Sequence, residues 1–274
     1  MPGIEFYRVS GSGNDFLALP EPAADPTPEQ VRAWCRRGVS LGADGLFTLR
    51  RGGSGSVVMD YRNADGSPGA LCLNGTRCAA RLAIDLGWAT GRVTVETGAG
   101  PLAARRLDDA TISVAAPPPT PAEPLTLEAE KASWTAWHLT VGVPHLVLLW
   151  PDSLATAPVA TLGRALRYHP ALAPAGANVD FVHLCPDRLQ IRTYERGVEA
   201  ETLACGTGVL AAAAVTLAVT PATLPLTAQT RGGFPLTVTG PDPTSWHLAG
   251  DARVLSHGRL LPDADASPTP PPWA

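Results

Sequence analysis

The sequence predicts an α/β protein built from two similar halves that follow one another along the chain. Two stretches carry this prediction, residues 70–80 and 201–215, because each is an alanine-rich helix that begins at a cysteine beside a glycine-containing turn. Each stretch follows short segments that are typical of strands and are bounded by turn-forming residues. We therefore expect a duplicated arrangement of strands around one buried helix, with a site where the two halves meet.

The first half begins with a strand and contains two helices. Pro28 near the start, and Gly38 after two arginines, are start and stop signals for a helix over residues 27–38. The first cysteine helix is expected over residues 74–86, with Gly87 as its C-terminal cap. The expected strands are residues 4–9, the turn-to-strand segment 42–47, and residues 57–62, 93–97 and 110–114.

The second half repeats this order after the proline-rich residues 117–121, which predict a stiff, extended linker. A short helix is expected over residues 162–166. The second cysteine helix is apolar on every side, which predicts that it is buried. The expected strands are residues 137–143, 145–150, 178–183 and 189–195. We place the halves at residues 1–117 and 118–262, followed by a proline-rich, disordered tail at 263–274.

Composition narrows the class of protein. The 274 residues are 45% hydrophobic and 17% charged, which allows a substantial core. A net charge of −4 without a basic stripe argues against a nucleic-acid partner. No apolar run is long enough to span a bilayer, and the first residues lack a signal-peptide pattern. Five irregularly spaced cysteines argue against a secreted disulfide framework, so we expect a cytoplasmic protein with no membrane partner.

The sequence also argues against the common cofactors. Lys131 is the single lysine and lies near the proline-rich linker, whereas a pyridoxal-phosphate enzyme needs a buried lysine for its Schiff base. No Cys-x-x-Cys or His-x-x-x-His spacing predicts a zinc site. The Gly11-x-Gly13 pair lacks the third glycine of a dinucleotide-binding motif, and Phe16 stands in its place. We therefore expect neither a cofactor nor a metal.

The two cysteines suggest acid–base chemistry. The N–H groups and dipole at a helix N-terminus favour negative charge, so we expect Cys205 to have a lowered pKa. If Cys72 and Cys205 face each other across a cleft, one thiolate can remove a proton from a carbon centre while the other thiol protonates the opposite face. The two helix N-termini would then stabilise a substrate carboxylate and the developing carbanion.

Other interpretations of these residues remain open. A buried cysteine at a tight turn is often only a small hydrophobic residue, and we expect Cys35, Cys78 and Cys185 to be structural. A Cys–His hydrolase is conceivable because His145 follows a proline. A rival from another class is a dithiol redox protein, in which the two helix-opening cysteines cycle through a disulfide.

Taken together, these stretches resemble the diaminopimelate epimerases, cofactor-independent enzymes that interconvert LL- and meso-diaminopimelate in lysine and peptidoglycan synthesis. The resemblance covers nearly the whole chain and is specific because the motifs occur as an ordered set. The motifs are Gly11-x-Gly13-Asn14-Asp15-Phe16, Asn63-Ala64-Asp65-Gly66-Ser67, Cys72-x-Asn74-Gly75-x-Arg77-Cys78, Pro144-His145, Asn178-Val179-Asp180-Phe181, Tyr194-Glu195-Arg196-Gly197 and Ala204-Cys205-Gly206-Thr207-Gly208.

The resemblance implies a fold, an assembly and a role for each matching residue. The fold would have two pseudo-symmetric halves, each a mostly antiparallel sheet or barrel around a central helix, with the active site in the interdomain cleft. The protein would be a homodimer that binds a small amino acid. Cys72 and Cys205 would be the acid–base pair, with His145 and Glu195 beside them to set their protonation. The implied substrate-binding residues are Asn14, Asn63, Leu73, Asn74, Gly75, Asn178, Glu195, Arg196, Gly206 and Thr207.

Some of these implied roles have alternatives. Arg196 is suited to a forked contact with the distant carboxylate of the substrate, whereas Asn63 could instead cap its own turn. Leu73 and Val143 depart from the family pattern, which has glycine and asparagine at these positions. A valine cannot donate a hydrogen bond, and a buried carboxylate that lacks one partner costs about 1–3 kcal/mol. A racemase of the same fold that acts on another amino acid is therefore the alternative hypothesis.

Overall fold

The computed structural model describes residues 3–265, which form two compact units. Unit 1 comprises residues 3–106 and 252–265, and unit 2 comprises Leu107–Asp251. The elements of unit 1 are β1 (Ile4–Gly11), β2 (Asn14–Pro20), α1 (Pro28–Cys35), β3 (Gly45–Arg51), β4 (Ser56–Asn63), α2 (Leu73–Asp85), β5 (Arg92–Thr97), β6 (Gly100–Arg106), β17 (Arg253–Leu260) and the 3-10 helix η4 (Pro262–Asp265).

The strands of unit 1 pair in the order β17-β1-β2-β3-β4-β5-β6. The pairs β2–β3 and β4–β5 are parallel and the others are antiparallel. β1 and β2 form a hairpin whose turn residues, Ser12 and Gly13, have φ values of 54° and 95°. Tight hairpins require such positive φ values, so the glycine here belongs to a strand-to-strand turn rather than to a dinucleotide-binding loop.

Helix α1 begins at a capping box, because Thr27 and Gln30 each bond the backbone N–H of the other. It ends at Cys35, before the predicted Gly38, because Arg36 is already extended. Its buried face packs with residues of β1, β2, β3 and β17. Trp34 in this face donates a 2.7 Å hydrogen bond from Nε1 to Asp265 of η4.

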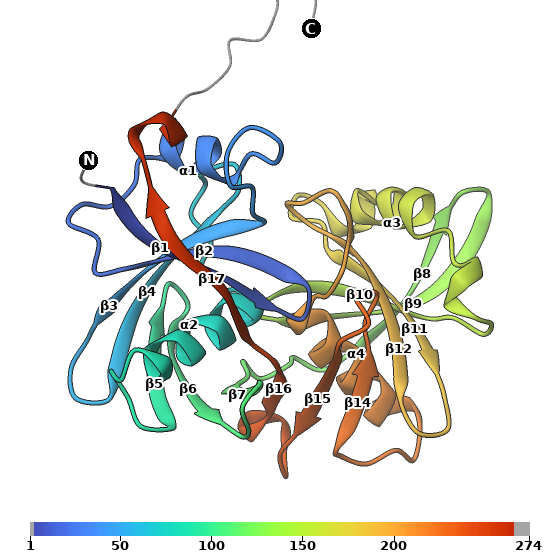
Figure 1. The fold of residues 1–274 in the computed structure, drawn as a ribbon. Coiled ribbons are helices and arrows are strands. Elements are labelled where there is room, and N and C mark those ends of the chain that lie inside the picture. Colours follow the sequence, from blue (N-terminus) through green and yellow to red (C-terminus); the bar gives the residue numbers. More distant parts are fainter. Residues whose placement is uncertain (1–2, 266–274) are drawn as a thin grey trace, which may run out of the picture. The chain divides into compact units, whose positions relative to one another are not determined.

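Helix α2 is the central helix of unit 1. It packs against β1, β2, β4, β5, β6 and β17, and its first eight residues are buried. Figure 1 shows α2 lying among the strands of this unit, whereas α1 lies near η4. The helix ends at Asp85, and Gly87 has a φ of 73°, as predicted for a C-terminal glycine.

Unit 2 repeats this design. Its elements are β7 (Thr111–Ala115), β8 (Glu123–Ala129), β9 (Ala132–Val141), β10 (Val143–Leu149), the 3-10 helix η1 (Leu154–Thr156), α3 (Val159–Arg167), the 3-10 helix η2 (Pro170–Leu172), β11 (Asn178–Leu184), β12 (Leu189–Glu195), β13 (Ala200–Thr202), α4 (Gly206–Val219), β14 (Leu226–Gln229), β15 (Pro235–Thr239), the 3-10 helix η3 (Pro243–Ser245) and β16 (His247–Asp251).

The pairing pattern of unit 2 matches that of unit 1. The strands pair as β8-β9-β10-β11-β12-β14-β15-β16-β7, and β13 also pairs with β12. The parallel pair β10–β11 encloses α3 in the sequence, as β2–β3 encloses α1. The parallel pair β12–β14 likewise encloses α4, as β4–β5 encloses α2. The predicted α/β fold with two similar halves is thus confirmed.

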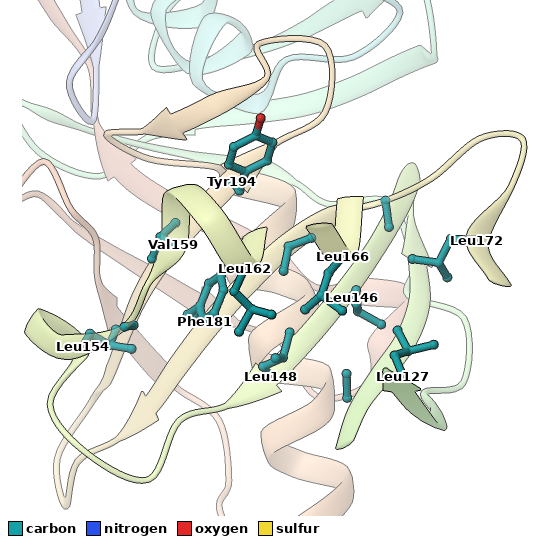
Figure 2. Close-up of a cluster of buried hydrophobic side chains, with 14 residues drawn as sticks. Leu127, Leu146, Leu148, Leu154, Val159, Leu162, Leu166, Leu172, Phe181 and Tyr194 are labelled. Carbon is teal, nitrogen blue, oxygen red and sulfur yellow. The ribbon is translucent and has the colours of Figure 1, made fainter. Parts of the chain in front are cut away.

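The two helices of unit 2 pack in different ways. Figure 2 shows Leu162 and Leu166 of α3 pointing toward Leu146, Leu148 and Phe181 of the sheet. Helix α4 packs against β9, β10, β11, β12 and β15, and ten of its residues are buried, as its apolar sequence predicts.

No helix in the part of the chain that the structure describes is long and apolar enough to cross a membrane.

The boundaries of the units differ from the predicted 1–117 and 118–262. β7 pairs with β16 and so belongs to unit 2, whereas β17 returns to unit 1 and pairs with β1. The proline-rich residues 117–121 lie inside unit 2, because the Thr120 backbone and hydroxyl both bond Thr140 of β9 at 2.9 Å. The predicted tail begins with residues of η4, and 266–274 lie outside the described residues.

Candidate active-site residues

The predicted site residues are divided between the two units, with Cys72 at the start of α2 in unit 1 and Cys205 at the start of α4 in unit 2. Cys72 is the N-cap of α2, with an extended backbone (φ −141°, ψ 99°), and its Sγ accepts a 3.4 Å hydrogen bond from the Gly75 N–H. The thiol is half-buried. The first-turn N–H groups of Leu73, Asn74 and Gly75 have no partner within the helix ladder, so this end of α2 favours negative charge.

Asn14 and Asn74 are brought together beside this helix start. The Asn74 Nδ2 donates to the Asn14 Oδ1, and the Asn14 Nδ2 donates to Asp44 at 3.1 Å. The Asn74 Oδ1 accepts from Arg77 at 2.8 Å, and Arg77 also donates to the Ser12 hydroxyl at 2.9 Å. Both amides therefore have a fixed orientation. Arg77, which is wholly buried, supports them, a role that the motif did not predict.

A carboxylate cluster holds the strand that carries Asn14. Asp15 pairs with Arg8 and Arg37, and Arg37 also bonds Asp44 at 2.8 Å. Burial disfavours the Asp15 carboxylate, but the hydrogen bonds and charges of the two guanidinium groups outweigh that effect and lower the pKa of Asp15. Asp44, which the sequence analysis left without a role, thus links this cluster to the Asn14 amide.

Asn63 is occupied by its own turn. Its Nδ2 donates to the Ser67 hydroxyl at 3.0 Å, and its Oδ1 accepts from the Tyr61 hydroxyl at 3.1 Å. The structure therefore places Asn63 in the local-turn arrangement that was its alternative interpretation.

Cys205 is the N-cap of α4 and is 7% exposed. Burial, followed by the charges of Glu195 and Asp180, raises its pKa well above the ordinary thiol value. The Thr207 hydroxyl, 3.4 Å from Sγ, and the Gly208 N–H oppose this shift but are weaker. The expectation of a lowered pKa for Cys205 was therefore wrong, because desolvation and two carboxylates outweigh the helix N-terminus.

His145 lies on β10 beside two residues of β11. Its Nδ1 is 2.7 Å from the Asp180 Oδ2, and both side chains are fully buried. Its Nε2 is 3.5 Å from the Asn178 Nδ2. His145 and Asn178 are register partners in the parallel β10–β11 pair, and Asp180 follows two positions later on the same face. The sequence signal for Asp180 was a polar residue at i+2 from Asn178 in an apolar strand.

Glu195 and Arg196 lie where β12 ends. Glu195 is near enough to Cys205 for its charge to raise the pKa of that thiol. The Arg196 backbone N–H donates to the Asn178 Oδ1 at 2.8 Å, so Asn178 fixes this turn. Gly206 and Thr207 are the first, buried residues of α4. Within unit 2, Glu195 thus acts on Cys205 at the start of α4, and Asn178 links His145 to the turn that carries Arg196.

The structure also shows where the two residues that depart from the family pattern, Leu73 and Val143, lie. Leu73 is the first residue of α2 and is 3% exposed, so its side chain is accommodated inside unit 1. Val143 is half-buried and begins β10 directly after Gly142, whose φ of 70° allows the tight reversal from β9.

Within residues 3–265, no cluster of three or more His, Cys, Asp or Glu side chains could hold a metal ion.

Solved structures share this fold. A probable proline racemase from Agrobacterium radiobacter K84 matches 97% of this chain and 96% of its own length, with a TM-score of 0.73 and 14% identity. A PhzF-family phenazine biosynthesis protein from Enterococcus faecalis has the same TM-score and identity and covers 95% and 100%. The chain is therefore an α/β protein of the duplicated fold found in these two proteins.

Sequence comparison gives the family within this fold. The diaminopimelate epimerase family model matches residues 6–119 and 138–254. The diaminopimelate epimerase of Aquifex aeolicus is 34% identical over 94% of this chain and 98% of its own length. That of Halorhodospira halophila is also 34% identical, over 97% and 98%. The chain belongs to the diaminopimelate epimerase family.

Proposed function

We propose that this chain is an isomerase that interconverts LL- and meso-diaminopimelate by moving the Cα proton between Cys72 and Cys205. The observation that carries the mechanism is that each central helix, α2 and α4, begins at a cysteine N-cap. The substrate is inferred from membership of the diaminopimelate epimerase family. The chain would act in lysine and peptidoglycan precursor synthesis.

The chemical difficulty is the low acidity of the α-proton. A thiolate can remove it only if the carbanion that forms is stabilised. The backbone N–H groups of Leu73 and Asn74, and those of Gly206 and Thr207, would bind the carboxylate next to the reacting carbon. The helix N-termini carry positive potential. Their interaction with the substrate carboxylate strengthens as negative charge moves onto that carboxylate in the carbanion. Gly75 completes the first turn of α2.

The different environments of the two thiols suggest which is the acid and which is the base before substrate binds. Burial and two carboxylates raise the pKa of Cys205, which favours its protonated form before substrate binds. In that resting state Cys205 would be the acid and Cys72 the base. The roles reverse in the opposite reaction direction, and Glu195 and His145 would assist the proton changes on the Cys205 side.

The remaining polar residues would bind the substrate. Asn14 and Asn74 are pre-oriented by their shared hydrogen bond and would contact it from unit 1. The Arg196 side chain would bind the distal carboxylate, in a turn that Asn178 holds. Asn63 would need to exchange its turn contacts to take part. We further propose that the active site lies in the interdomain cleft and that the protein is a cytoplasmic homodimer.

The direct test is deuterium incorporation at Cα in heavy water under reducing conditions. The substrates are LL-diaminopimelate, meso-diaminopimelate and a panel of L-amino acids that includes proline and hydroxyproline. The proposal expects exchange with both diaminopimelate isomers and little exchange with the panel. Reactions started from the LL- or the meso-isomer should reach the same equilibrium mixture of the two. Absence of exchange with any substrate would overturn it and favour the dithiol redox hypothesis.

A second candidate is a racemase of the same fold with another substrate. Val143 favours it, because a valine stands where the resemblance implies an asparagine that binds the non-reacting end of diaminopimelate. A substrate with a shorter or apolar side chain would not need that contact. Exchange with one amino acid of the panel, and none with diaminopimelate, would establish this alternative.

A further inference from the structure

Asp180 is a fully buried carboxylate whose charge helps to raise the pKa of Cys205, but whose contact with His145 has no role in the proposed reaction. It lies in the middle of β11, where an ionised side chain is costly unless it is bonded on all sides. Its Oδ2 is 2.7 Å from the His145 Nδ1, and its Oδ1 accepts a 2.7 Å hydrogen bond from the Thr193 hydroxyl. Neighbouring strands on both sides of β11 therefore supply its partners.

The first turn of α4 also approaches this carboxylate. A Cβ atom built on Gly208 would lie 2.4 Å from the Asp180 Oδ1 and 3.3 Å from the Cys205 Cβ. Only glycine at position 208 leaves room for the carboxylate beside the helix N-terminus, where negative charge is favoured. Asp180 thus lies between the imidazole of His145 and the residues that carry the Cys205 thiol.

The hydrogen bonds around His145 are consistent with one tautomer. An ionised Asp180 only accepts hydrogen bonds, so the Nδ1 must carry the proton between them. The Asn178 Oδ1 accepts from the Arg196 N–H at 2.8 Å, which turns the Asn178 Nδ2 toward Pro144 and the His145 Nε2. An amide N–H faces the Nε2, so the Nε2 must keep its lone pair.

We propose that Asp180 is a positioning residue that holds His145 in the Nδ1–H tautomer, with the Nε2 lone pair facing the Asn178 amide. The tautomer assignment stands on the geometry of unit 2, whereas its effect on turnover rests on the proposed function. The His145 Nε2 lone pair would then hold the Asn178 amide that fixes the Arg196 turn, and Asp180 would act through His145 without touching the substrate.

The substitution Asp180→Asn should reverse this arrangement. Because the Thr193 hydroxyl donates to Oδ1, the asparagine would turn its carbonyl toward Thr193 and its NH₂ toward the His145 Nδ1. His145 would then carry its proton on Nε2, where it meets the Asn178 N–H with no acceptor between them. In the serine-protease triad the same substitution keeps the geometry and lowers kcat by about 10⁴ through the wrong tautomer.

The experiment is ¹⁵N NMR of histidine ring nitrogens in the full-length protein, with His145→Gln used to assign the His145 signals. Wild type should show a protonated Nδ1 and an unprotonated Nε2. Asp180→Asn should move the proton to Nε2, whereas the exposed Asp187→Asn should leave the spectrum unchanged. A wild-type His145 protonated on Nε2 alone would overturn the proposal, even if Asp180→Asn failed to fold. An unchanged tautomer in folded Asp180→Asn would also overturn it.

Steady-state kinetics separates positioning from simple loss of fold. Asp180→Asn should lower kcat by about 100-fold or more, with a much smaller change in KM, because the substrate does not touch Asp180. Wild-type kcat in Asp180→Asn would contradict the positioning role. If wild type fails to turn over diaminopimelate, the proposed function is wrong, but the NMR result still decides the tautomer.

Discussion

The Asn178 side chain accepts a hydrogen bond from the backbone N–H of Arg196 at 2.8 Å. Through its Nδ2 it also donates to the Pro144 carbonyl oxygen at 3.3 Å. One buried amide therefore joins the start of β10, the start of β11 and the turn after β12. This link sets the position of Arg196 relative to His145 within unit 2.

Asn178→Leu should weaken both stability and activity. Leucine has a similar size but leaves the partly buried Arg196 N–H and the Pro144 carbonyl without this partner, which costs about 1–3 kcal/mol of unfolding free energy. Because the turn that follows Glu195 would shift, kcat/KM should fall by about 10-fold or more. Urea unfolding and steady-state kinetics measure both effects. Gln190→Leu, a half-buried amide on β12, is the control, and equal behaviour of the two variants would contradict the prediction.

Glu195→Gln should make the Cys205 thiol more acidic. Burial is the first cause of the raised pKa of Cys205, and the Glu195 charge is the second. Loss of that negative charge favours the thiolate, so the pKa falls and the thiolate appears at lower pH. Alkylation of Cys205 by iodoacetamide, followed by mass spectrometry across a pH series, should show a midpoint at lower pH than in wild type. A midpoint that stays in place, or rises, would show that Glu195 does not act on Cys205.

Gly208→Ala should disrupt the start of α4. The added methyl group would lie 2.4 Å from the Asp180 Oδ1, so the carboxylate or the helix must move. We expect a loss of about 1–3 kcal/mol in unfolding free energy and about 100-fold in kcat/KM. Gly53→Ala is the matched control, because its new Cβ meets no atom closer than 4.0 Å. Wild-type activity in Gly208→Ala would be incompatible with the packing described for Asp180.

Asp15→Asn should remove a pH-dependent part of the stability. The pKa of Asp15 is lowered in the folded state, so its ion pairs stabilise the protein above the unfolded value of about 3.9 and are lost as pH falls through the folded value. The variant should be less stable than wild type by about 1–3 kcal/mol at pH 7, and the difference should shrink below about pH 4. Urea unfolding at several pH values, with the exposed Asp152→Asn as control, measures this. A difference that is independent of pH would rule out the ion-pair explanation.

Local patterns in the sequence predicted much of the fold. Both cysteine helices, the repeated order of elements and about half of the strands follow from periodicity, turn residues and helix caps. Among the strands that were not predicted, β2 begins directly after the Ser12–Gly13 turn. The unit boundary was misplaced because pairing between β1 and β17, or between β7 and β16, joins residues far apart in sequence, and no local pattern encodes it.

The site was predicted less completely than the fold. Cys72 and Cys205 were found because a helix N-cap is a local feature. Asp180 and Arg77 belong to the matched motifs but received no role, because the function of a buried charged residue depends on its partners, which the sequence does not show. The pKa of Cys205 was predicted with the wrong sign for the same reason, since burial and the Glu195 charge depend on tertiary packing.

The central claim is that both thiols take part in proton transfer. Cys72→Ser and Cys205→Ser keep a side chain suited to the N-cap position but replace each thiol with a far less acidic hydroxyl. Chiral chromatography would measure the epimerisation of LL-diaminopimelate, with Cys185→Ser as the control for loss of a half-buried thiol. The account predicts that each helix-cap variant loses at least about 100-fold in rate and that Cys185→Ser keeps the wild-type rate. A wild-type rate in either Cys72→Ser or Cys205→Ser would contradict the two-thiol mechanism.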